Sequence, residues 1–255
     1  GNVAVLELTP SQFGIREGDI VVSTNHLEST ALVDDPVSQA RQAQTTTVPR
    51  RQRLDTIVKG LPPQVGPTHL LEVLRDRKNS LGVPLPPGHR HSIDALIATH
   101  SVIFDSTARK LWVGHGPHTL GDYKAYDVRK MIYADSPQEM KESYEAPLPA
   151  DPLLSFATAL DQTRQLWNEV NYLLDNQELD AAKLLLEKTR LMAHHPTTLQ
   201  LRGKLAEETG ELAWAQRFYQ QALASPPEYF IETAQLKQTI SRLEKRIENE
   251  AHASR

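Results

Sequence analysis

The feature that most constrains the fold is a change in the spacing of apolar residues at the proline-rich segment 145–152. Before this segment, apolar residues alternate in short runs, which is typical of β-strands; after it they recur every three to four residues, which is typical of helices. A chain of 255 residues is long enough for two ordinary domains. The sequence therefore predicts an α+β domain over residues 1–147, a linker, and an all-α region over residues 153–250.

The composition excludes several classes of function. The net charge is −4 and no strongly basic block is present, so nothing favours nucleic-acid binding. The sequence contains no run of about 18 apolar residues, so it predicts no membrane span. The chain has no cysteine, so it supplies no disulfide, no thiolate metal ligand and no cysteine nucleophile.

The N-terminal half is predicted to combine strands with a few helices. Apolar runs predict strands at 2–9 and 19–24, and helical spacing predicts helices at 50–59 and 68–77. The clearest pair of strands is 101–105 and 110–114, which flank a four-residue connection. Antiparallel pairing is therefore expected.

The helical half contains a repeat with an offset of 33 residues, because residues 178–182 align with residues 211–215. Small residues occupy the positions where two antiparallel helices would cross: Ala182, Gly203, Ala215 and Ala222. A terminal helix carries one apolar stripe: Ile231, Leu236, Ile240, Leu243 and Ile247. The pattern predicts a tetratricopeptide-like region with a groove for a peptide or partner protein. The alternative is that these helices only pack against the first domain or form a dimer contact. This alternative is favoured, because isolated helix pairs of this kind often only complete a fold.

The first candidate for chemistry is Asn25, which lies in the sequence Ser-Thr-Asn-His at the end of an apolar run. The side-chain amide of an Asn at a strand end can donate a hydrogen bond to a developing oxyanion. The alternative is that Asn25 only caps the following loop, as polar residues at strand ends often do. Spacing alone favours the alternative.

A second set of candidates consists of arginines beside polar turns: Arg50, Arg51, Arg53 and Arg90. A guanidinium can hold a carboxylate or orient a nucleophile. For any single one of them, a solvated helix start or loop charge is the favoured interpretation.

Histidines are dense in the same half of the chain: His89, His91, His100, His115 and His118. A His-x-His pair on one strand would place both imidazoles on one face as a metal pair, with Asp94 or Asp105 nearest. Most histidines bind no metal, so a metal-dependent hydrolase is the weakest of the hypotheses. We predict no metal site and no cofactor.

Several segments together carry a family resemblance. They are residues 2–8, residues 22–26, the Arg50–Arg53 helix, residues 98–105 and residues 111–117. Their order and spacing resemble the penicillin acyltransferase-like family of cysteine amide hydrolases (acyl-coenzyme A:6-aminopenicillanic acid acyltransferase and its bacterial relatives). The resemblance covers roughly residues 1 to 130.

The resemblance implies an N-terminal-nucleophile (Ntn) hydrolase fold, an αββα sandwich of two stacked antiparallel sheets between helical layers, of which this chain would hold a part. It implies that Asn25 is the oxyanion-hole residue and that an arginine lines the pocket. Arg90 is the expected arginine and Arg50 its rival. His26, in the same motif as Asn25, is assigned to substrate binding.

The nucleophile of that family is a cysteine exposed by self-cleavage, and this chain has none. We therefore expect the chain to be part of an amide hydrolase or acyltransferase acting on a small amide or acyl-thioester, with the nucleophile in the remainder of the same precursor. A leader in such a precursor would direct export. A lineage that has lost catalysis is the other explanation. The alternative function is a non-catalytic interaction module that uses the helical region.

Overall fold

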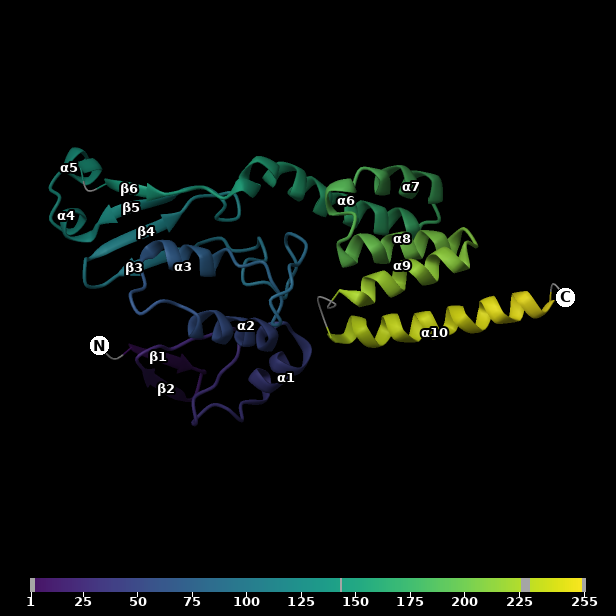
Figure 1. The fold of residues 1–255 in the computed structure, drawn as a ribbon, viewed down its shortest axis with the longest axis horizontal. Coiled ribbons are helices and arrows are strands. Elements are labelled where there is room, and N and C mark those ends of the chain that lie inside the picture. Colours follow the sequence, from purple (N-terminus) through teal and green to yellow (C-terminus); the bar gives the residue numbers. More distant parts are fainter. Residues whose placement is uncertain (1–2, 143, 226–229, 254–255) are drawn as a thin grey trace.

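The two sheets of the structure are antiparallel, and both belong to the N-terminal half (Figure 1). The structure is a computed structural model that describes residues 3–142, 144–225 and 230–253, without the side chains of residues 140–145, 230–231 and 253. The helices and strands together form a mixed α+β architecture, so the predicted α+β class is confirmed.

The first sheet pairs β1 (Val3–Leu8) with β2 (Phe13–Gly18). Leu6 lies opposite Ile15, and Leu8 lies opposite Phe13. These four side chains share one face of the ribbon and are more than half exposed. The predicted strand at 2–9 is confirmed over residues 3–8, and residue 2 lies outside the described residues. The strand predicted at 19–24 is wrong: β2 ends before it, because the short turn after β1 aligns residues 13–18 with β1.

The second sheet has the strand order β3 (Val102–Asp105), β4 (Lys110–Gly114), β5 (Tyr123–Asp127), β6 (Tyr144–Leu148). The predicted hairpin is confirmed, since Asp105 pairs with Lys110 across four connecting residues. The predicted linker is wrong over 145–148, where β6 forms the edge of the sheet. Pro147 is tolerated there because an edge strand leaves one side of its backbone unpaired.

The helices of this half are α1 (Pro36–Gln44), α2 (Thr47–Lys59), α3 (Pro67–Leu74), α4 (Val128–Ile132) and α5 (Pro137–Glu142). The two predicted helices correspond to α2 and α3, although α3 is capped at Gly66 and not at Thr68. Helix α3 packs on the second sheet through a core formed by Leu71, Ile103, Trp112, Tyr123 and Ala125. Figure 1 shows α2 and α3 between the two sheets. The described residues do not stack one sheet on the other, so the predicted αββα layering is not confirmed.

The C-terminal half is helical, with elements η1 (Pro152–Phe156), α6 (Ala157–Asp175), α7 (Leu179–Glu187), η2 (Arg190–Met192), α8 (Pro196–Glu208), α9 (Leu212–Ala224) and α10 (Phe230–Ala253). Consecutive helices pack side by side from α8 through α10 (Figure 1). The small residues Ala182, Ala215 and Ala222 are fully buried. The α10 stripe is buried at Leu236, Ile240 and Leu243; the side chain of Ile231 lies outside the description. The tetratricopeptide-like assignment itself stays a prediction.

One cluster of the core joins the two halves. Leu96 and Leu120 from the N-terminal half pack with Ala157, Leu160 and Met192 from the helical half. A polar clamp lies beside this cluster: the α6 side chain Arg164 donates to the backbone oxygens of Leu96 at 2.9 Å and Ala95 at 3.2 Å. Helix α6 therefore fixes the loop that contains residues 95 and 96. Within the described part of the chain, no helix is long and apolar enough to cross a membrane.

Candidate functional site

Asn25 lies in an irregular segment after β2 that hydrogen bonds hold on both sides. Thr24 Oγ1 donates to the backbone oxygen of Thr47, the first residue of α2, at 3.2 Å. His26 Nδ1 lies 2.8 Å from Thr47 Oγ1, and the amide of Leu27 donates to Ser38 Oγ on α1 at 2.8 Å. The residues flanking Asn25 are therefore attached to two helices, while the Asn25 side chain is exposed.

A buried carboxylate holds the same segment from the other side. Glu7 on β1 accepts from the backbone amides of Glu28 at 2.9 Å and Ser29 at 2.8 Å, and from Arg16 Nε at 2.8 Å. Burial raises the pKa of Glu7, but the hydrogen bonds from Ser29 and the charge of Arg16 outweigh burial and lower that pKa overall. Glu7 therefore stays ionised and anchors residues 28 and 29.

The side chain of Asn25 is oriented by Arg50 on α2. Arg50 Nη2 donates to Asn25 Oδ1 at 2.6 Å. A guanidinium has only donors, so the oxygen of the carboxamide must face Arg50 and the NH₂ group must face away. No described residue accepts a hydrogen bond from that NH₂ group, which leaves its two N–H bonds for a ligand.

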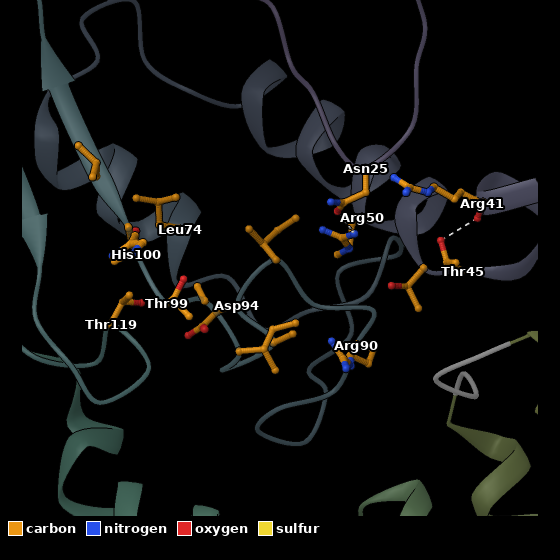
Figure 2. Close-up of a pocket in the computed structure, with 17 residues that line it drawn as sticks. Asn25, Arg41, Thr45, Arg50, Leu74, Arg90, Asp94, Thr99, His100 and Thr119 are labelled. Carbon is orange, nitrogen blue, oxygen red and sulfur yellow. Dashed lines mark hydrogen bonds between the residues drawn. The ribbon is translucent and has the colours of Figure 1, made fainter. Parts of the chain in front are cut away.

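Asn25, Arg50 and Arg90 line one pocket of about 840 Å³ (Figure 2). The rest of the lining combines charged, hydroxyl, histidine and apolar residues: Arg41, Thr45, Thr46, Leu74, Ile93, Asp94, Ala95, Ile97, Ala98, Thr99, His100, Ser101, Val102 and Thr119. The structure thus brings together the three residues assigned to catalysis, which are as many as 65 positions apart in the chain.

The electrostatics of the pocket are set by its arginines. Burial, and then the positive charge of Arg90, lower the pKa of the Arg50 guanidinium, which nevertheless keeps its charge. The carboxylate of Asp94 is bound by Arg77 Nη2 at 2.5 Å. Burial raises the pKa of Asp94, and the charge of Arg77 opposes this effect. Asp94 therefore contributes little negative charge to the pocket.

His26, predicted to bind substrate, does not line this pocket. Its side chain is buried and lies among Thr24, Thr47 and Glu28. It borders a second, adjoining hollow of about 490 Å³. Burial, and then the charge of nearby arginines, lower the pKa of His26, so it is neutral near pH 7. Its contacts are those of a residue that positions Asn25; substrate binding by His26 stays a prediction.

The other predicted arginines bond carboxylates of the protein. Arg51 pairs with Glu28 and, at 2.9 Å, with Asp55. Arg53 makes a two-point contact with Asp76 at 2.9 and 2.6 Å. Both therefore have structural roles in holding α2, although they are partly buried and paired with carboxylates and do not form the solvated helix start that the sequence favoured.

The histidines form no metal site among the described residues. His89 and His91 lie in a loop and not on a strand, so the predicted shared strand face is wrong. Their rings meet edge to face at 5.3 Å. His115 bonds Asp122, and His118 bonds Asp161 at 2.6 Å. His100 alone of the five lines the pocket.

Sequence reasoning missed Arg41, which lines both hollows. The signal was available, because Arg41 carries the only charge on α1 and so has no ion-pair partner within its helix. It also missed Leu96, which lies between the pocket residues Ala95 and Ile97 with a positive φ of 51°. Such a conformation costs roughly 1–3 kcal/mol, and Arg164 holds it through the carbonyl of Leu96.

Comparisons with models of protein families, with curated proteins and with solved structures found no match to this chain.

Proposed function

We propose that residues 1–147 are part of a cysteine amide hydrolase or acyltransferase of the N-terminal-nucleophile class, with Asn25 as the oxyanion donor. One observation carries the proposal: Arg50 holds the oxygen of Asn25, so its NH₂ group is available to the pocket that Arg50 and Arg90 also line. The positive charge beside Oδ1 polarises the carboxamide and strengthens its N–H groups as donors.

The reaction proceeds by acyl transfer through a thiolate from outside these 255 residues, since the chain has no cysteine. The thiolate attacks the carbonyl carbon of an amide or thioester, and the carbonyl oxygen becomes an anion that accepts a hydrogen bond from Asn25. The C–N or C–S bond then breaks, the leaving group takes a proton, and an acyl-thioester remains on the nucleophile. Water or an amine attacks this thioester and releases the acyl group.

The test is to produce the chain together with the remainder of its precursor and to measure hydrolysis of a panel of N-acyl amides. Asn25→Ala is expected to lower kcat by about 10²–10³-fold, the usual effect of losing one oxyanion donor. Thiol alkylation is expected to abolish the activity. Asn249→Ala on α10 is the matched control, because this exposed residue lies far from the pocket in the sequence and on the surface of the helical half.

Two outcomes contradict the proposal. One is an assembled protein without thiol-dependent activity on any amide or thioester. The other is an Asn25→Ala protein that keeps its kcat while its thermal unfolding is unchanged.

A second function is favoured by a hollow of about 450 Å³ on the helical half. Polar side chains from α6 and α8 line it beside Trp167 and Tyr219: Asn168, Asn171, Thr197, Gln200 and Lys204. Such a surface suits an extended peptide, whose backbone amides need donors and acceptors. A peptide-array screen tests this function. A peptide that binds in this hollow should lose affinity at least tenfold in the Gln200→Arg variant. If no bound peptide shows such a loss, the second function is rejected.

A further inference from the structure

The pocket beside Asn25 is positively charged although the whole chain has a net charge of −4. Three arginines reach it from separate segments: Arg41 from α1, Arg50 from α2 and Arg90 from the loop before β3. The one carboxylate in the described lining, Asp94, is bound to Arg77. The lining therefore carries an excess of positive charge that an anion would neutralise.

Two of these arginines are set apart from others in the same half. Four neighbouring arginines bond carboxylates of the fold: Arg16 with Glu7, Arg51 with Asp55, Arg53 with Asp76 and Arg77 with Asp94. Arg41 and Arg50 bond no carboxylate within the described residues. Figure 2 shows the guanidinium of Arg41 extending toward Asn25 and Arg50. Two guanidinium groups beside one exposed amide suit a ligand that carries a carboxylate near its amide.

The second hollow adds an apolar surface on the other side of Asn25. Its lining includes apolar residues of β1 and α1, namely Val5, Leu6, Leu8 and Val37, beside polar residues that include Glu7, Ser23, Thr24, Asp35 and Ser38. Asn25 and Arg41 border both hollows. A ligand whose amide lies at Asn25 therefore meets Arg50 and Arg90 in the first hollow, Arg41 where the two hollows adjoin, and apolar residues of β1 and α1 in the second.

We propose that the site binds N-acylated amino acids, with Arg41 recognising the carboxylate and the apolar residues of the second hollow holding the acyl chain. This inference rests on the proposed function, because it places the ligand's amide at Asn25. It adds a substrate class and a residue that recognises its charge.

The test uses the full chain and two probes of equal shape, N-hexanoylglycine and its neutral analogue N-hexanoylglycinamide, measured by isothermal titration calorimetry. We expect the carboxylate to bind about tenfold more tightly, the difference that one charge-assisted hydrogen bond gives. Arg41→Gln should remove most of this preference without changing the affinity for the neutral probe. Arg41→Lys keeps the charge and should retain part of the preference.

Arg129→Gln is the matched control, since it removes one exposed arginine that lines neither hollow. Circular dichroism confirms that each variant is folded. Added salt should weaken the carboxylate probe more than the neutral one.

Three results overturn the inference: equal affinity of the wild-type chain for the two probes, binding of neither at millimolar concentration, or an unchanged preference in Arg41→Gln. Inorganic phosphate that binds as tightly as N-hexanoylglycine also overturns it, because the site would then read charge and not an acylated amino acid. These results are distinguishable from failure of the proposed function, which concerns kcat in Asn25→Ala. If Asn25→Ala keeps its kcat while Arg41→Gln loses the preference for the carboxylate probe, the pocket binds anions but Asn25 is not the oxyanion donor.

Discussion

His195 should make the stability of the protein depend on pH in a way that one substitution can isolate. Its side chain is 1% exposed at the start of α8. The centre of its ring lies 4.5 Å from the ring centre of Trp167 on α6 and 6.0 Å from that of His89 in the loop before β3. Burial, followed by the charges of His89 and Arg164, lowers the pKa of His195 from 6.5 to about 3.

The sign follows from proton binding in the two states. The unfolded chain binds a proton to this residue near pH 6.5, whereas the folded chain does so only near pH 3. The stability that neutral His195 contributes is therefore complete above pH 6.5 and is lost progressively as the pH falls from 6.5 to 3. The loss reaches about 2 kcal/mol at pH 5 and about 5 kcal/mol below pH 3.

The assay is urea unfolding followed by tryptophan fluorescence at about pH 7.5 and about pH 5, with the free energy of unfolding extrapolated to water. His195→Asn removes the titration but keeps a side chain that can accept the hydrogen bond from the amide of Thr197. Between the two pH values, the wild-type protein should lose about 2 kcal/mol more than the variant.

His194→Asn is the control, because it removes an exposed histidine one position earlier. This variant should lose as much stability as the wild type between the two pH values. The reasoning is refuted if His195→Asn also loses as much as the wild type, since His195 would then titrate alike in the folded and unfolded states.

Three further predictions concern stability. Gly203→Ala should cost about 1–3 kcal/mol in urea unfolding, because the added Cβ would lie 2.7 Å from the ring of Tyr219. Asp151→Asn should cost about 3 kcal/mol in the same assay, because it leaves the charge of Arg77 less compensated in a buried site. Burial raises the pKa of Glu7, but hydrogen bonds and a nearby arginine lower it overall, so its stabilisation should disappear as the pH falls through a value below 4.5. A Glu7→Gln variant should show a smaller loss of thermal stability over that acid range.

The spacing of apolar residues was sufficient to predict strands whose partners lie close in the sequence. The hairpin of β3 and β4 followed from two apolar runs and a polar connection, because the pairing of Asp105 with Lys110 closes within a few residues. It was insufficient for β2, where the apolar run from Ile20 to Val22 was the stronger local signal. The short turn after β1 decided the pairing, and Phe13 and Ile15 became strand residues that face solvent.

The candidate site was likewise predicted only in part from the sequence. The sequence singled out Asn25 and left Arg50 and Arg90 as rivals, because distance along the chain gives no way to choose between them. In the structure both line the pocket, with different tasks: Arg50 bonds Asn25, and Arg90 adds charge. The isolated charge of Arg41 on α1 could have marked it as a candidate, but its place in the pocket depends on where α1 lies in the tertiary structure.

The clamp between Arg164 and the loop at residues 95 and 96 has a consequence for how this chain can be divided. A truncation before α6 would leave two carbonyls without their donor and Leu96 without the support of its left-handed backbone. The helices would then be inseparable from ligand recognition, although no residue described in them lines the pocket. Engineers who transplant the helical half as a cassette should therefore find that the protein left behind binds its ligands poorly.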